Sequence, residues 1–300
     1  MLKDKQVFFL MGVLYIASGL LNEHILEGGV STGLFLLLRS SLILAISMAY
    51  SKAKRISIAH KVSPVLVLRL LCSGLGMYGV LSGYQYISAT LVSVLQKTDI
   101  IFIFLIGLWY GYRLTKFRVA LLLSALFVIV IMILLSGDLD EDLLGYAFVL
   151  GGVVLLSVGA HLAKQMSVLE NQYVLINVSC YSGIAVGLTM VFLNGYQLSN
   201  PTEIVPMIFL ASIVTFYLFR LLSRLYLNHN PEVIQFPSLI AAFLIIIPEM
   251  VFEQKVFDVS FIVCNTLYLL IITLFLFHER ILRILLGAKE QSVEIINSEL

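Results

Sequence analysis

Ten runs of about 20 mainly apolar residues follow one another along the chain, and this repetition constrains its fold more than any other feature. A helix of about 20 residues can cross the hydrocarbon core of a bilayer, whereas a soluble α/β protein would show short apolar strands between amphipathic helices. The runs cover residues 6–22, 31–50, 64–86, 89–110, 115–136, 143–164, 173–194, 204–225, 231–252 and 258–278. We therefore predict an all-α polytopic membrane protein with ten transmembrane helices.

The composition argues against several other classes of protein. Of the 300 residues, 60% are hydrophobic and 12% are charged, whereas a soluble domain carries about a quarter charged residues. A net charge of +1 gives no reason to expect a nucleic-acid partner. Cys72, Cys180 and Cys264 lie far apart within apolar runs, so we expect these cysteines to act as small buried hydrophobic side chains. No GxSxG sequence, Walker loop, paired carboxylates or metal-ligand spacing occurs, so we expect neither an enzyme nor a metal or cofactor.

Lys and Arg residues gather in alternate connections between the runs, as in membrane proteins whose cytoplasmic loops are enriched in these residues. With the N-terminus inside, the inside set is Lys3, Lys5, Lys52, Lys54, Arg55, Lys61, Arg113, Lys116, Arg118, Lys164, Arg220, Arg224, Arg280, Arg283 and Lys289. The outside connections hold Lys255 as their one basic residue, and an acidic set of Glu23, Glu27, Asp138, Asp140, Glu141, Asp142 and Glu203. We predict that both termini are cytoplasmic. Short loops and few cysteines favour a bacterial inner (plasma) membrane.

An acidic extracytoplasmic linker, residues 137–142, divides the chain into two sets of five helices. The first repeat is 1–136, the second is 143–278, and a cytoplasmic tail follows at 279–300. An odd number of spans in each half places the halves in opposite orientations, which predicts two inverted five-helix repeats with the solute held between them.

Several short motifs carry a family resemblance. The sequence Tyr86-Ile87-Ser88-Ala89 leads into the fourth run, the link before the fifth reads Gly111-Tyr112-Arg113-Leu114-Thr115, and Phe252-Glu253 precedes the tenth. Arg39 lies inside the second run and Tyr15 inside the first. In these features and in its layout the whole chain resembles the drug/metabolite transporter superfamily, specifically its ten-helix EamA-type branch. It departs from that pattern at Tyr112, where the family has Glu, at Asp99, where the family has Pro, and in the register of Pro237 and Pro248.

The resemblance implies a secondary transporter that moves a small metabolite by alternating access, and we expect an exporter. Because no ATP-binding sequence is present, a gradient would supply the energy, and Asp99 is a candidate proton carrier. The expected partners are the lipid bilayer and a small solute, with the chain acting as a monomer or a homodimer. The alternatives are a flippase for a lipid-linked or amphipathic solute, a membrane enzyme acting on lipids, and a scaffold.

Ionisable groups inside the bilayer are the first candidates for a solute site, because each costs several kcal/mol unless it is paired or hydrated. Lys97 and Asp99 lie near the centre of the fourth run, next to Gln96. On a continuous helix, two residues two positions apart point about 200° away from each other. We therefore expect Asp99 to pair with Arg39, and Lys97 to face the cavity and bind a carboxylate or phosphate. Two alternatives stay open: Lys97 is buried and Asp99 binds a proton or cation, or the charges only fix helix packing.

Three more polar residues complete the candidate set. Tyr78 could line the entrance to the solute path, although tyrosines near helix ends are more often interfacial anchors. Gln235 in the ninth run could donate a hydrogen bond to the solute or accept one from it. We expect Glu249, farther along the same run, to reach the water of the headgroup layer.

The charge pattern predicts where reporter proteins fused to the chain will lie. Fusions after Lys54 and after Arg113 should both report the cytoplasm, and a fusion within 137–142 should report the opposite side, because the predicted spans alternate in direction. Alkaline phosphatase and green fluorescent protein activities provide the measurement. If the first two fusions lie on opposite sides, the two-half arrangement is wrong.

Overall fold

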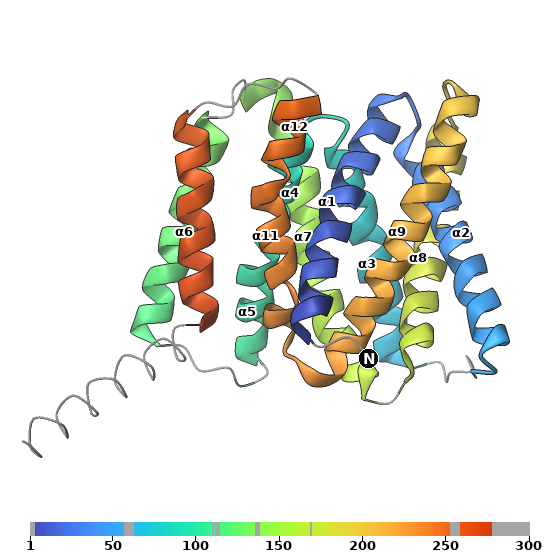
Figure 1. The fold of residues 1–300 in the computed structure, drawn as a ribbon, viewed down its shortest axis with the longest axis horizontal. Coiled ribbons are helices and arrows are strands. Elements are labelled where there is room, and N and C mark those ends of the chain that lie inside the picture. The colour runs from blue at the N-terminus through green and yellow to red at the C-terminus, as the bar shows by residue number, and fades with distance from the viewer. Residues whose placement is uncertain are drawn as a thin grey trace, which may run out of the picture. The chain divides into compact units, whose positions relative to one another are not determined.

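In the computed structural model, residues 4–56, 63–109, 111, 115–135, 139–168, 170–252 and 259–277 are described, and these residues form helices and no strands. An isolated antiparallel bridge joins Val30 and Leu198. The helices are α1 (Asp4–Glu27), α2 (Thr32–Ala53), α3 (Pro64–Gly83), α4 (Ala89–Gln96), α5 (Asp99–Trp109), α6 (Lys116–Leu135), α7 (Leu139–Ser167), α8 (Gln172–Asn194), α9 (Pro201–Asn228), α10 (Pro231–Ile234), α11 (Phe236–Leu244), α12 (Ile246–Phe252) and the helix Val259–Phe277 (Figure 1).

The lengths of these helices confirm a multi-pass membrane protein. Within the described residues, nine helical segments are long and apolar enough to cross a bilayer, counting Ala89–Trp109 as one. The ninth predicted run contains a shorter apolar segment, Phe236–Val251. Each predicted run therefore corresponds to a helical segment of the structure.

The fourth and ninth predicted helices differ from the prediction because each is interrupted. α4 ends at Gln96 and α5 begins at Asp99, and between them the backbone N–H groups of Lys97 and Thr98 bond three residues back, to Val94 and Leu95. The ninth run divides into α10, α11 and α12 at Gln235 and Ile245.

The interruptions of the ninth run follow from its prolines. Pro237 and Pro248 have no N–H to donate and clash with the carbonyl group four residues earlier. Each lies two or three residues after a break, at Gln235 and Ile245. No proline stands at the break between α4 and α5, where instead the Thr98 hydroxyl donates a 2.7 Å hydrogen bond to the Leu95 carbonyl.

The predicted linker and tail are only partly within the described residues. α7 begins at Leu139, so residues 139–142 of the predicted linker belong to a helix. Residues 136–138 and the tail at 279–300 lie outside the described residues.

The chain divides into two compact units, and this division differs from a split at residues 137–142. The larger unit holds Met1–Tyr112 and Gly137–Phe257, and the smaller holds Arg113–Ser136 and Asp258–Leu300. Each unit therefore takes helices from both predicted repeats. In the smaller unit, the Arg118 guanidinium lies 5.9 Å from the centre of the Phe275 ring.

The two most closely packed helix pairs of the larger unit are α3 with α7, and α2 with α8. A Cβ atom added to Gly152 of α7 would lie 2.7 Å from the Gly76 carbonyl oxygen of α3, and one added to Gly187 of α8 would lie 2.7 Å from the Leu37 nitrogen of α2. Small residues allow this close approach of backbones, which drives helix association where no water is present. Both pairs join the first predicted repeat to the second.

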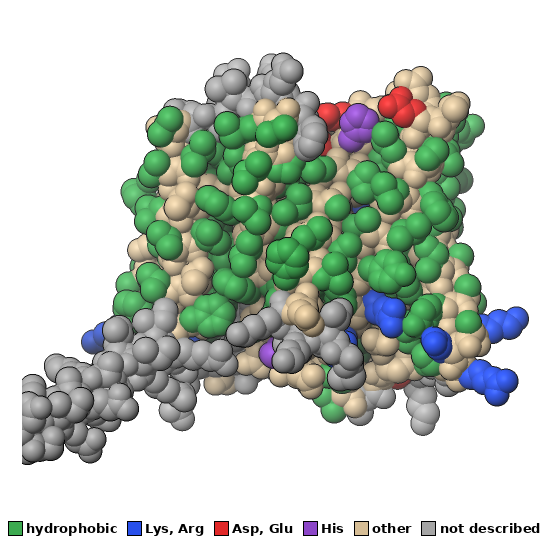
Figure 2. Space-filling view, in the orientation of Figure 1, with side chains coloured by type: hydrophobic (Ala, Val, Ile, Leu, Met, Phe, Trp, Pro, Cys, Tyr) green, Lys and Arg blue, Asp and Glu red, His purple; other side chains and the backbone are tan. Residues whose placement is uncertain are grey.

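Charged side chains of the larger unit separate toward its two ends. We call the end with Lys52, Lys54 and Lys164 the basic end, and the end with Glu27 and Glu203 the acidic end. In Figure 2, exposed Lys and Arg side chains of this unit gather at one edge and most of the visible Asp and Glu side chains at the opposite edge, with apolar side chains between. His24 and Glu203 lie 3.9 Å apart at the acidic end, and both side chains are exposed.

Two neighbouring glycines of α7 test the close contact between α3 and α7. Gly152→Ala should lower the free energy of unfolding by about 1–3 kcal/mol, because the new methyl group meets backbone atoms of α3. Gly151→Ala is the matched control: no atom lies within 4 Å of its added Cβ, and alanine favours the helix by about 0.5–1 kcal/mol. Unfolding of the purified protein in mixed micelles measures both. Equal stability of the two variants would contradict the packing described here.

Candidate functional site

The interruption between α4 and α5 places Lys97 in the interior of the larger unit. Lys97 is only 4% exposed, and its Nζ lies 5.3 Å from the centre of the Tyr15 ring of α1. Asp99, the first residue of α5, is 9% exposed, and its Oδ1 has no hydrogen-bond partner in the described part of the chain. Two ionisable side chains therefore stand at a helix break within a membrane span.

A carboxylate from α1 holds the start of α4. The Glu23 Oε1 accepts a 2.8 Å hydrogen bond from the Ala89 N–H, and the Ser88 Oγ accepts one of 3.4 Å from the Leu91 N–H. A carboxylate at a helix N-terminus accepts hydrogen bonds from free N–H groups, and its negative charge is attracted to the positive end of the helix dipole. Glu23 was predicted only to belong to an outside connection, yet the structure buries it as a capping group for an eight-residue helix.

Two cavities meet at Lys97. The first has a volume of about 220 Å³ and reaches Ala163 and Tyr226, near the ends of α7 and α9, so we call it the basic-side cavity. The second has a volume of about 140 Å³ and reaches Asn22 and Tyr84, so we call it the acidic-side cavity. The side chains that line both are Tyr15, Met77, Gln96, Lys97, Leu156, Leu218 and Phe219.

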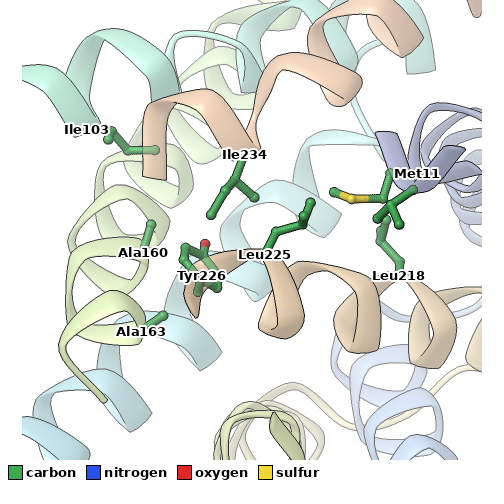
Figure 3. Close-up of a cluster of buried hydrophobic side chains, with 9 residues drawn as sticks. Met11, Ile103, Ala160, Ala163, Leu218, Leu225, Tyr226 and Ile234 are labelled. Atoms are coloured by element: carbon green, nitrogen blue, oxygen red, sulfur yellow. The ribbon is translucent and has the colours of Figure 1, made fainter. Parts of the chain in front are cut away.

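The walls of the basic-side cavity are mainly apolar. Figure 3 shows part of them as a cluster of buried side chains from α1, α5, α7, α9 and α10. Ile103, Ala160, Ala163, Leu218 and Tyr226 belong to both the cluster and the cavity lining. A solute here would meet a few polar groups against an apolar surround, as in most small-molecule sites.

Arg69 of α3 is a polar group that the sequence interpretation did not single out. It is 7% exposed, lines the basic-side cavity, and donates from Nη2 to the Leu175 carbonyl (3.3 Å) and the Ser179 Oγ (3.4 Å). Its Nε and Nη1 have no hydrogen-bond partner within the described residues. An arginine inside the apolar run 64–86 was a sufficient signal, because charged residues are rare within spans.

Arg39 does not form the ion pair with Asp99 that the sequence suggested. It is 5% exposed, donates from Nη1 to the Asn22 Oδ1 (3.1 Å), lies 5.0 Å from the Phe35 ring centre, and lines the acidic-side cavity. Asp99 lines the basic-side cavity instead. The expectation assumed a continuous fourth helix, and the turn at Lys97 and Thr98 changes the direction in which Asp99 points.

The other predicted residues divide between the cavities and the surface. Gln96 lines both cavities, and Gln235, at the break between α10 and α11, lines the basic-side cavity. Tyr78 lines neither and is partly exposed. Glu249 is fully buried, so the expectation that it reaches headgroup water is wrong.

The described residues contain no group of three or more His, Cys, Asp or Glu side chains that could hold a metal ion. What the arrangement offers chemically is a set of charged and hydrogen-bonding groups around a solute-sized space.

No family model and no curated protein matches this sequence. A solved structure described as "Crystal structure of protein" is similar, with a TM-score of 0.68 and 15% sequence identity over 90% of this chain and 94% of the other. At this identity the likeness concerns the fold alone. It extends across nearly the whole of both chains.

Removing the Glu23 carboxylate tests its role at the start of α4. Glu23→Ala should lower the free energy of unfolding by about 1–3 kcal/mol, because a buried N–H loses its acceptor. Glu23→Gln keeps an acceptor oxygen and should cost less. Glu203→Gln is the control at the same end, since its contact with His24 is long and exposed and should contribute almost nothing. Thermal unfolding in detergent measures all three, and a Glu23→Ala protein as stable as the control would contradict the capping role.

Proposed function

We propose that this chain is a secondary transporter that carries a small solute between its two cavities by alternating access. The observation that carries the proposal is the position of Lys97, which is buried at a helix break where the basic-side and acidic-side cavities meet. The same function is implied by the resemblance of the sequence to EamA-type drug/metabolite transporters.

The cost of the arrangement supports a functional role. A lysine inside a membrane span costs about 2.5–3.5 kcal/mol or more, and the helix break replaces regular α-helical hydrogen bonds with tighter three-residue bonds of poorer geometry. A protein that only filled the membrane would avoid both costs. A carrier uses them, because the break places Lys97 and its charge beside the cavities, where a solute near the middle of the bilayer can reach them.

The second interrupted helix supports two inverted repeats. Gln235 stands at the break between α10 and α11, in the fourth span of the second half, and the α4–α5 break is in the fourth span of the first half. Interrupted helices at matching positions in two halves are typical of transporters whose site lies at the repeat interface. α11 lies against α4 and α1, as the contacts and Figure 1 show, so both breaks occur in one region.

The cavity volumes favour a small metabolite over a lipid-linked solute. Sites for drug-sized ligands have volumes of about 300–1,000 Å³, and these cavities have volumes of about 220 and 140 Å³. A lipid-linked sugar would need more space. Asp99, which borders the same cavity as Lys97, is our candidate for a proton-coupling group.

Substitution of Lys97 tests the proposal. Lys97→Ala should reduce transport by about 10–100-fold, because a charged hydrogen bond to a solute contributes about 1.5–3 kcal/mol. Lys97→Arg should retain part of the activity, and the exposed Lys52→Ala should retain all of it. Cells that lack or overproduce the protein, grown on a panel of toxic metabolites, would identify a solute, and uptake into vesicles of purified protein would then give the rates.

The result that contradicts the proposal is specific. If Lys97→Ala inserts, stays monodisperse in detergent and transports the identified solute at the parent rate, the solute path does not pass Lys97. If no metabolite changes growth or accumulation, and purified vesicles move none of them, the protein is not a metabolite carrier.

A further inference from the structure

Three basic side chains border the two cavities in sequence from one end of the larger unit to the other. Arg69 lines the basic-side cavity alone, Lys97 lines both, and Arg39 lines the acidic-side cavity alone. All three are at least nine-tenths buried. Asp99 is the one acidic residue among the described lining residues of both cavities, so the lining carries an excess of positive charge.

The order of the three follows from their places in the helices. Arg69 is the sixth residue of α3, which begins at the basic end, so it lies about 7–8 Å along that helix. Arg39 is the eighth residue of α2, which begins at the acidic end, so it lies about 10–11 Å from that start. Lys97 stands at the interruption inside the span Ala89–Trp109, between the two arginines.

Both arginines have donors that the protein does not satisfy. In the described part of the chain, Nε and Nη1 of Arg69 and Nε of Arg39 are buried without hydrogen-bond partners. A buried donor without a partner costs about 1–3 kcal/mol, more when it is charged. A guanidinium presents its N–H groups in a planar fork that matches a carboxylate or a phosphate. The missing partners are therefore acceptors of negative charge.

We propose that the solute carries an anionic oxygen group, a carboxylate or a phosphate, on a small apolar body. Lys97 binds the anionic group where the cavities meet, Arg69 binds it in the basic-side cavity, and Arg39 binds it in the acidic-side cavity. The apolar body lies against Leu156, Leu218 and Phe219, which line both cavities. This inference rests on the proposed transport function and specifies its substrate class.

A neutral or cationic solute fits these observations poorly. It would leave the excess of buried positive charge without compensation, and the interior of a membrane protein makes this costly. Asp99 compensates at most one of the three charges. An anion compensates one more positive charge at each position along the two cavities. It also accepts hydrogen bonds from Arg69 in one cavity and from Arg39 in the other.

Matched probes test the charge requirement. Phenylacetate and phenyl phosphate should each raise the unfolding temperature of the purified protein in detergent, because a ligand that binds the folded state stabilises it. Phenylacetamide and phenethylamine have similar apolar bodies but no negative charge, and they should not raise it. The larger of the two shifts shows whether the site prefers a carboxylate or a phosphate. Lys97→Gln should abolish the shift, and Arg220→Gln should keep it, because Arg220 lines neither cavity and lies 4.7 Å from the Tyr50 ring centre.

Transport from each side tests the separate roles of the arginines. In vesicles of known orientation, Arg69→Gln should raise the KM for the anion at least 10-fold from the basic end and little from the acidic end. Arg39→Gln should show the opposite asymmetry. Arg69→Lys and Arg39→Lys, which keep the charge, should recover most of the affinity, which separates an electrostatic role from loss of folding.

Each outcome decides the inference. It is overturned if the neutral probe stabilises as well as the anions, if no anionic probe stabilises the protein, or if both arginine variants change transport equally from the two sides. Lys97-dependent transport of a neutral solute would overturn the inference and leave the proposed function intact. Anion binding that depends on Lys97, together with no transport in vesicles, would support the anion site and overturn the proposed function.

Discussion

Hydrocarbon offers no hydrogen bonds, and the rest of this structure depends on that constraint. A spanning segment must satisfy its backbone within its own helix, so the chain forms one apolar helix after another. Where the regular helix is interrupted, at Lys97 and Thr98 and again at Gln235, the interruptions lie beside a cavity inside the larger unit. The hydrocarbon of the bilayer thus explains why most of the chain forms continuous helices and why the helix breaks lie inside the protein.

The supporting groups around α4 show how a short helix is kept in such surroundings. A helix of eight residues has few internal hydrogen bonds, and its first N–H groups need acceptors from elsewhere. Glu23 of α1 and Ser88 supply them. Arg39, through Asn22, attaches to the same end of α1. One polar group of residues therefore joins α1, α2 and α4 near the acidic-side cavity.

The sequence predicted the helical runs well, because run length and hydrophobicity are local properties. It also singled out Lys97, Gln96 and Gln235, which the structure places in the cavity linings, since a polar side chain within an apolar run is visible without a structure. It did not predict the break between α4 and α5, which contains no glycine or proline, and so it wrongly paired Arg39 with Asp99. The importance of Arg69 and Glu23 depends on which helices become neighbours, and this cannot be read from one run at a time.

The glycine contacts between α3 and α7, and between α2 and α8, have a consequence for motion. At Gly152 and Gly187 the nearest atoms of the partner helix belong to its backbone, which has no rotamers to change, so sliding there would separate or overlap atoms already in contact. These four helices are suited to serve as a rigid frame. The interrupted helices, whose hydrogen bonding is irregular at the breaks, are then the natural places for bending. Under the proposed transport function, the rearrangement that exposes Lys97 to one side or the other would be a local flexing within a fixed framework.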